Sequence, residues 1–201
     1  MATTQMGIIN LALGRIGVKK IAAIDEDSTQ RIAATDIWDY IRDEVLEARE
    51  WKFAKTRDEI DIYILRLTDE NGNYFVDENG DTITVSDGLS YGNQYAYELP
   101  TDFLRIAKGS KLYPAVYSDY NAEVSWLIES LYDVAGDGLE HLVLTTDFYV
   151  EDTPYYITYI RKVTNVAAWT PAFIKAFAFR LAQELALTLT EGMQKYEAMG
   201  I

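Results

Sequence analysis

Apolar residues near the N-terminus recur at helical spacing. Residues at positions i, i+3, i+7 and i+10 share one face of a helix. Glycine adopts the left-handed conformation that commonly ends a helix, and Gly17 follows the series directly. The pattern predicts a short amphipathic helix that ends at about Gly17, with a connector over residues 18–26. The apolar face of this helix consists of Met6, Ile9, Leu13 and Ile16.

A second helix is predicted to begin near Asp27 or Ser28 and to end around Trp51. Asp27, with Gln30 three residues later, resembles a capping box. In a capping box the side chain at the helix start accepts a hydrogen bond from a backbone N–H that has no partner within the helix. Charged residues fill most of the face opposite the apolar stripe, as in a helix that packs on one side. The apolar stripe comprises Trp38, Ile41, Val45 and Ala48, widened by Ile37 and Leu46.

From about residue 58 the apolar period changes to two, which indicates β-strands. Two Asn-Gly pairs then follow, Asn71-Gly72 and Asn79-Gly80, and this dipeptide supplies the positive φ angles of tight hairpin turns. We therefore expect residues 60–92 to form a meander with a projecting hairpin.

Further strands are expected between this hairpin and the C-terminal helix. Apolar and aromatic residues alternate with polar ones, and Gly136-Asp137-Gly138 provides a turn. The run over residues 155–163 is rich in the β-branched and aromatic residues that strands favour. The expected strands include Tyr95, Tyr97 and Leu99, then Phe103 to Ile106, then Val124, Trp126 and Ile128, and finally residues 140–146 and 155–163.

A third helix is predicted over residues 170–192. Thr170 suits the N-cap, and Pro171 suits the first helical position, where its missing N–H costs nothing. The apolar face contains Ile174, Phe177, Leu181 and Leu185. The sequence thus predicts an α+β fold in a single domain, residues 1–201. Its helical part comprises residues 1–56 and 170–192, packed together, and its β-rich, sandwich-like part comprises residues 57–165.

Composition excludes several kinds of chemistry. The chain has no cysteine, so it has no disulfide, thiolate metal site or cysteine nucleophile. Its one histidine, His141, is expected on a strand or at the surface, and no catalytic residue, metal site or cofactor is expected. No apolar run reaches the roughly 18 residues of a membrane helix, and no secretory signal is expected.

The formal net charge of −14 argues against a protein that reads nucleic acid, because phosphate contacts require clustered lysine and arginine. An acidic wall would instead repel DNA that slides past it. Solubility alone is the simpler explanation of this charge.

Carboxylates in the chain form no convincing catalytic or metal site. Asp77, Asn79 and Asp81 have the spacing that opens an EF-hand loop, but Thr82 and Gly88 stand where the loop needs glycine and glutamate. Hairpin turns explain this segment better than calcium binding does. Two acidic pairs, Glu26-Asp27 and Glu151-Asp152, are expected in solvated loops, because nothing in the sequence brings them across a cleft.

Three stretches of the chain, taken together, resemble the phage tail tubular protein A family, the podovirus-type head-to-tail adaptors. Their order and spacing extend over most of the chain. The first stretch carries Asn10, Ala12, Leu13, Ile16, Gly17, Arg42-Asp43, Trp51, Phe53 and Ala54. The second is residues 97–106, YELPTDFLRI. The third carries Tyr159-Ile160, Arg161, Val163-Thr164, Phe173 and Leu181-Ala182.

The resemblance implies a non-enzymatic virion protein of the neck or tail, made in the host cytoplasm. It implies a dodecameric ring that joins the portal protein to the tail nozzle or other tail proteins. Genomic DNA would pass through the channel without sequence-specific binding, and no membrane is involved. Residues expected to pack the fold are Leu13, Ile16, Trp38, Ile41, Trp51, Phe53, Tyr97, Leu99, Phe177 and Leu181.

The sequence departs from the family in two places. Arg49-Glu50-Trp51 replaces the family's His-Pro-Trp-like end of the second helix, and residues 60–92 are longer than the family implies. We interpret the longer hairpin, with Asn71, Gly72, Asn79 and Gly80 at its turns, as a contact with the tail or neck.

Two alternatives stay open at this stage. One is a virion-associated carbohydrate-binding or depolymerase module, which the single histidine and the lack of a nucleophile motif disfavour. The other is a nonviral binding module with a projecting hairpin, which would make the resemblance accidental.

Overall fold

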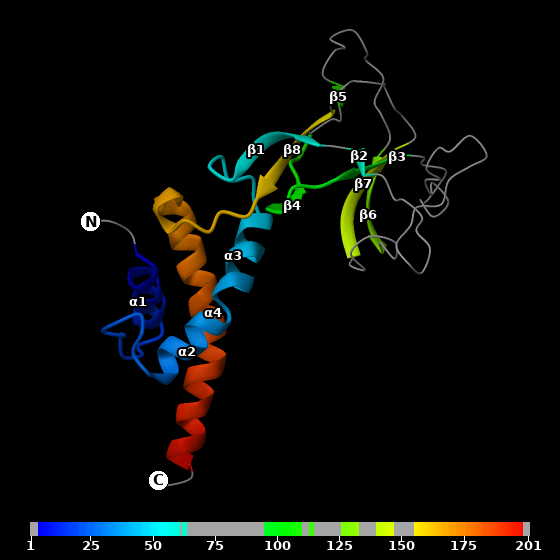
Figure 1. The fold of residues 1–201 in the computed structure, drawn as a ribbon. Helices are drawn as coiled ribbons and strands as arrows, with labels where there is room; N and C mark the ends of the chain where they lie inside the picture. The colour runs from blue at the N-terminus through cyan, green and yellow to red at the C-terminus, as the bar shows by residue number, and fades with distance from the viewer. Residues whose placement is uncertain are drawn as a thin grey trace, which may run out of the picture. The chain divides into compact units, whose positions relative to one another are not determined.

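The computed structural model describes residues 4–60, 62–63, 95–109, 113–114, 126–132, 140–146 and 155–198. Within them, four α-helices and two four-stranded sheets confirm the α+β class (Figure 1). The chain forms two compact units, which we call the helical unit, residues 1–56 and 160–201, and the β unit, residues 57–159.

The first helix, α1 (Gln5–Arg15), has the predicted end and a cap that was not predicted. The hydroxyl of Thr4 accepts the N–H of Gly7 at 3.1 Å and caps the helix start. After Ile16, Gly17 adopts a φ of 71°, and the N–H of Val18 returns to the Leu13 carbonyl at 3.1 Å. This is the Schellman arrangement that a glycine at this position permits.

The predicted second helix is wrong in its extent, because the segment forms two helices, α2 (Thr29–Asp36) and α3 (Trp38–Glu47), interrupted at Ile37. The hydroxyl of Thr35 donates to the Arg31 carbonyl at 2.8 Å, a bond that bends helices. The Asp27–Gln30 capping box is also wrong. Ser28 is the N-cap, and its hydroxyl accepts the Arg31 N–H.

The last helix, α4 (Pro171–Ala198), follows a 3-10 turn, η2 (Val166–Ala168), and extends past the predicted end at residue 192. Thr170 accepts the N–H groups of Phe173 and Ile174, through its hydroxyl and its carbonyl, so the predicted cap is confirmed. The other three helices all contact α4 (Figure 1). Its core-facing residues are Phe173, Phe177, Ala178, Leu181, Ala182, Leu185 and Leu189.

The strands form two sheets. The first has the order β1-β8-β4, with β5 also paired to β8, and the second, antiparallel, has the order β2-β3-β7-β6. The first sheet comprises β1 (Lys55–Ile60), β4 (Phe103–Ile106), β5 (Tyr113–Pro114) and β8 (Tyr155–Arg161). The second comprises β2 (Ile62–Tyr63), β3 (Tyr95–Glu98), β6 (Trp126–Tyr132) and β7 (Glu140–Thr146).

Side chains of both sheets share one core in the β unit. Tyr97 of β3 packs against Tyr155 of β8, with ring centroids 4.8 Å apart. The hydroxyl of Tyr159 donates to Asp102 at 2.8 Å, which satisfies a buried phenol. The turns predicted at Asn71-Gly72, Asn79-Gly80 and Gly136 to Gly138 fall outside the described residues. The buried members of the core are Ile60, Tyr97, Leu99, Leu144, Tyr155, Ile157 and Tyr159.

Candidate functional site

Aromatic rings from three segments of the helical unit meet around Phe173. The ring centroid of Phe173 lies 4.8 Å from that of Trp169, 5.1 Å from Trp51 and 5.2 Å from Phe53. The indole N–H of Trp51 donates to the Val45 carbonyl at 2.7 Å, and that of Trp169 donates to the Val163 carbonyl at 2.9 Å. Both polar atoms of these large rings are therefore satisfied, and the cluster is a packing core with no reactive group.

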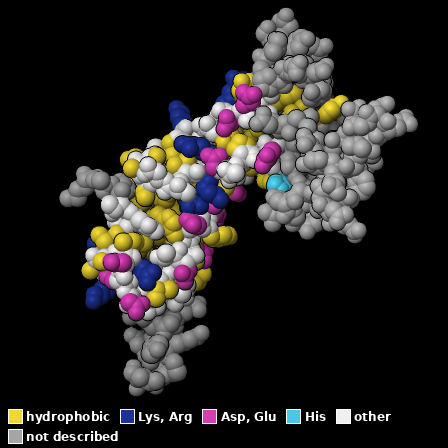
Figure 2. Space-filling view, in the orientation of Figure 1, with side chains coloured by type: hydrophobic (Ala, Val, Ile, Leu, Met, Phe, Trp, Pro, Cys, Tyr) yellow, Lys and Arg dark blue, Asp and Glu magenta, His cyan; other side chains and the backbone are white. Residues whose placement is uncertain are grey.

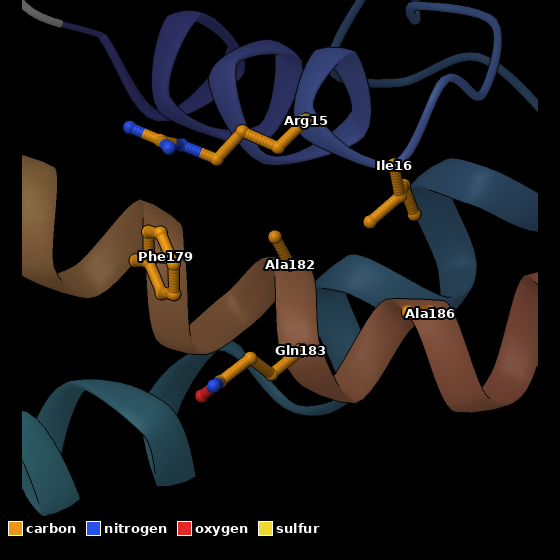
Figure 3. A pocket seen from close by; sticks show the side chains of 6 residues that line it. All are labelled: Arg15, Ile16, Phe179, Ala182, Gln183 and Ala186. Atoms are coloured by element: carbon orange, nitrogen blue, oxygen red, sulfur yellow. The ribbon is translucent and has the colours of Figure 1, made fainter.

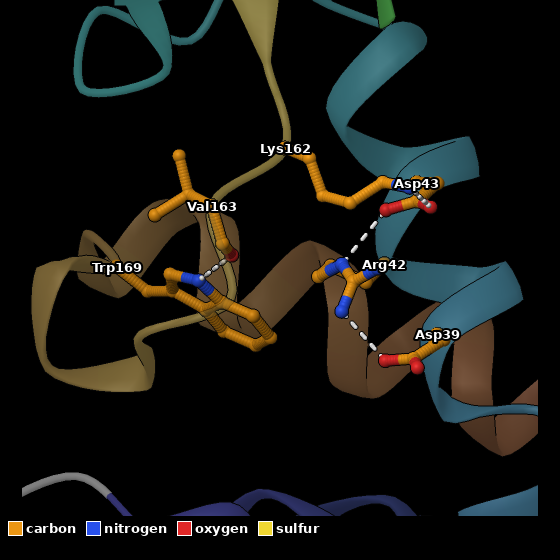
Figure 4. Close-up of polar contacts among 6 residues, drawn as sticks. All are labelled: Asp39, Arg42, Asp43, Lys162, Val163 and Trp169. Atoms are coloured by element: carbon orange, nitrogen blue, oxygen red, sulfur yellow. Dashed lines mark hydrogen bonds and ion pairs between the residues drawn. The ribbon is translucent and has the colours of Figure 1, made fainter. Parts of the chain in front are cut away.

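A buried arginine connects α3 to the segment that follows β8 (Figure 4). Arg42 donates to Asp39 at 2.6 Å and to Asp43 at 2.7 Å, while Lys162 approaches the other oxygen of Asp43 at 3.3 Å. The Arg42 side chain is only 6% exposed, whereas that of Asp39 is 77% exposed. The network neutralises a buried guanidinium with two carboxylates, which is a structural role.

A second ion-pair group joins α3 to α4. Arg180 donates to both carboxylate oxygens of Glu44, at 2.8 and 3.0 Å, and it also bonds Glu184 one turn later on α4. The hydrogen bond to Glu44, followed by the bond to Glu184, raises the pKa of Arg180 above its ordinary value. All three side chains are partly exposed, so this group orients the two helices and adds little stability.

A hollow of about 320 Å³ lies between α1 and α4 (Figure 3). The guanidinium of Arg15 stands 5.1 Å from the ring centroid of Phe179, in cation–π range. Phe179 is 52% exposed, although it is a large aromatic residue on a helix with a well-formed core face. We call this hollow the socket. Its lining residues are Arg15, Ile16, Phe179, Ala182, Gln183 and Ala186.

Glu26 and His141, two of the titratable residues discussed in the sequence analysis, lie in described parts of the chain. Glu26 accepts the Ser28 hydroxyl at 2.7 Å and the Ala22 and Ala23 N–H groups, and these bonds, the one from Ser28 foremost, lower its pKa. His141 lies on β7, as predicted for a strand histidine. Within the described part of the chain, no group of three or more His, Cys, Asp or Glu could hold a metal ion.

The residues expected to pack the fold do not all lie at the same depth. Ile16, Trp51 and Phe53 are partly exposed, and Ile16 lines the socket. The hairpin residues Asn71, Gly72, Asn79 and Gly80 lie outside the described residues. The expected packing residues that are buried are Leu13, Trp38, Ile41, Tyr97, Leu99, Phe177 and Leu181.

Sequence reasoning missed the socket and the buried Arg42. One signal for the socket was available, because Phe179 falls between the core positions Phe177 and Leu181, on the predicted outer face of the last helix. Arg42 gave no such signal, since arginine among acidic residues is typical of a solvated face.

The excess of negative charge lies in one unit. Residues 57–159 hold 20 of the 32 Asp and Glu residues but only 5 of the 18 Lys and Arg residues, a net charge of −15. The helical unit has 13 basic and 12 acidic residues, a net charge of +1. Figure 2 shows both signs interspersed over the described surface of the helical unit.

Comparisons with known proteins add no family or relative: no protein-family model matches the chain, and no curated protein is similar to it. Among the helices within the described residues, none combines the length and apolar character that a membrane crossing requires.

Proposed function

We propose that this chain is a structural subunit of a phage neck, a head-to-tail adaptor that forms a dodecameric ring between the portal protein and the tail. In this proposal it is not an enzyme, and genomic DNA passes through the ring. The carrying observation is that residues from separate resembling stretches meet in one cluster. Trp51 and Phe53, from the first stretch, pack on Phe173, from the third.

Other residues that carry the resemblance also have roles that hold the helical unit together. The amide of Asn10 binds Ile21 twice, accepting its N–H and donating to its carbonyl, both at 2.9 Å. This clamp fixes the connector after α1, and a hydrophobic residue at position 10 would leave two partly buried backbone groups without partners. Arg42 and Asp43 form the network that ties α3 to Lys162. Such a pattern supports a scaffold better than it supports a catalyst.

The distribution of charge supports the passage of DNA. A net charge of −15 on the β unit would repel phosphates, and its 5 basic residues offer too few cations for tight binding. We assign the electronegative wall of the channel to this unit. The helical unit, at +1, provides a surface on which protein contacts are not opposed by like charge.

Electron microscopy of the purified chain, mixed with the portal ring of the same phage, tests the assignment. We expect a collar on one end of the portal, with the portal's symmetry. The portal ring of an unrelated phage serves as the control and should stay bare. A chain that stays free of its own portal at concentrations where neck proteins assemble would contradict the proposal.

A further inference from the structure

The strand β6 forms one edge of the second sheet. It pairs with β7 over its whole length, from Trp126 to Tyr132, in a continuous antiparallel register without a bulge. The sheet order β2-β3-β7-β6 places no described strand on its other side (Figure 1). In an antiparallel pair, alternate residues bond the neighbouring strand, so the N–H and C=O groups of the other residues point outward. Within the described part of the chain, β6 therefore offers a row of backbone groups to a further strand.

β6 lacks the features that protect the other sheet edges from pairing. The usual protections are a short strand and charged side chains. β2 and β4, each at the edge of a sheet, have two and four residues. β1, the other edge of the first sheet, has six residues, of which Lys55, Arg57, Asp58 and Glu59 are charged. β6 has seven residues, with no proline, no lysine and one charged residue, Glu129.

The side chains of β6 are incompletely covered, although they belong to the core of the β unit. Trp126 and Ile128 pack against that core and are partly exposed, and Leu127, on the opposite face, is 37% exposed. On the adjacent strand β7, by contrast, Val143 and Leu144 are buried. A strand added beside β6 would cover the flanks of its apolar side chains, so apolar burial would accompany the backbone hydrogen bonds.

The second sheet is acidic, which defines the charge of a suitable partner. Its four strands contain three glutamates and neither lysine nor arginine. Glu98 and Glu140 are exposed, and neither takes part in an ion pair between described residues. The β unit as a whole has a net charge of −15, so two copies would repel each other along this edge. The same charge attracts a strand that carries lysine and arginine.

We propose that β6 binds an extended, basic segment of a tail protein, which pairs with it as a further strand of the second sheet. The inference rests on the proposed function, which supplies the tail partner. The occupant is extended because only a strand can bond the outward backbone groups of β6 one after another. It is about seven residues long because β6 has seven. Its alternate apolar side chains extend the core beside Trp126 and Ile128.

Fluorine NMR of the full chain tests the inference with synthetic peptides as probes. Trp126 is the one tryptophan of the β unit, so labelling with 5-fluorotryptophan places a reporter on β6, and Trp126→Phe identifies its resonance. The probe is a peptide of alternating lysine and valine, with lysine at both ends and the length of β6. We expect it to shift the Trp126 resonance and to leave those of the other tryptophans unchanged. Hydrogen–deuterium exchange should show that the peptide protects residues 126–132.

Two control peptides separate strand pairing from simple charge attraction. The first has proline in place of the central valine, which keeps every lysine but interrupts a strand. The second has glutamate in place of every lysine and keeps the alternation. Neither should shift the Trp126 resonance. An equal shift with either control peptide overturns the inference, and so does the absence of a shift with the lysine–valine peptide.

A pair of variants locates the contact at the edge of the sheet. Leu127→Lys puts a cation where the basic strand would lie, and we expect it to weaken binding of the lysine–valine peptide about tenfold. The matched control is Leu142→Lys, because Leu142 is 46% exposed and lies on β7, one strand further from the edge. It adds the same charge to the same sheet and should change the affinity by less than about twofold. Circular dichroism checks that both variants are folded, and equal weakening by the two contradicts the inference.

The portal mixture separates this inference from the adaptor assignment. A collar on the portal, with no shift of the Trp126 resonance by the lysine–valine peptide, leaves the adaptor role standing and overturns the edge contact. A peptide-specific shift without a collar supports the edge contact and overturns the adaptor role. Protection of residues 126–132 that rises with the concentration of the chain alone would identify a second copy as the occupant, and it overturns the basic partner.

Discussion

Replacing Phe173 by alanine should unfold the helical unit more readily than any change of an exposed residue on α4. Phe173 is fully buried, and its ring contacts those of Trp51, Phe53, Trp169 and Phe177. The substitution removes the ring at the centre of this cluster.

The expected loss in the free energy of unfolding follows from the burial of Phe173 and from its ring contacts. Phe→Ala in a protein core costs about 3–5 kcal/mol, and each aromatic pair contributes about 0.5–1.5 kcal/mol beyond its buried area. With four ring partners, Phe173→Ala should fall in the upper part of that range, at about 4 kcal/mol. For a urea m-value of about 2 kcal/mol per molar, the midpoint of unfolding falls by about 2 M.

Urea unfolding followed by tryptophan fluorescence measures the effect in the right unit, because Trp38, Trp51 and Trp169 belong to the helical unit and only Trp126 to the β unit. The matched control is Phe179→Ala, the same change on the same helix at a residue that is 52% exposed, expected within about 0.5 kcal/mol of the unaltered chain. A Phe173→Ala cost below about 1.5 kcal/mol, or one equal to the control, would refute the packing argument.

Three further changes test local features. Gly17→Ala forces a side chain into a φ of 71° and should cost about 1 kcal/mol in urea unfolding, and an unchanged midpoint would contradict the helix-end geometry. Arg42→Ala should cost about 2 kcal/mol, less than a fully buried pair because Asp39 is exposed, and Arg42→Met, which keeps the apolar stem volume, should recover part of it. The lowered pKa of Glu26 means that its ionised form stabilises the fold above the unfolded pKa, and that this is lost as pH falls through the lower folded value. Glu26→Gln should therefore flatten the decline of the urea midpoint between about pH 5 and pH 3, and an unaltered slope would contradict this.

Features set by a few neighbouring residues could be predicted from the sequence. Gly17 ends α1 because only the local φ matters there, and Thr170 with Pro171 starts α4 because cap and fixed φ are both local. The strand over residues 140–146 is confirmed at both ends. For the two helix ends, the nearest residues along the chain contain the cause.

Features set by distant residues could not be predicted in this way. The break at Ile37 lies inside the single helix that the sequence predicted, and both α2 and α3 contact α4, which is distant in sequence. Arg42 lies buried beside Asp43, which also pairs with Lys162, and the sequence gives no sign that Lys162, far along the chain, comes close to α3. The socket likewise needs Arg15 and Phe179, which lie at opposite ends of the chain.

Net charge is a property of the whole chain, and it conceals how differently the two units are charged. A value of −14 describes neither the β unit, at −15, nor the helical unit, at +1. Many copies of a protein with a uniformly spread charge of this size would repel one another at every contact. Concentrating the net charge in one unit leaves the other near neutral, so charge repulsion does not oppose its contacts with other proteins. In the proposed ring, this division would meet two demands, because copies must attract one another and the channel must not hold the DNA that passes through it.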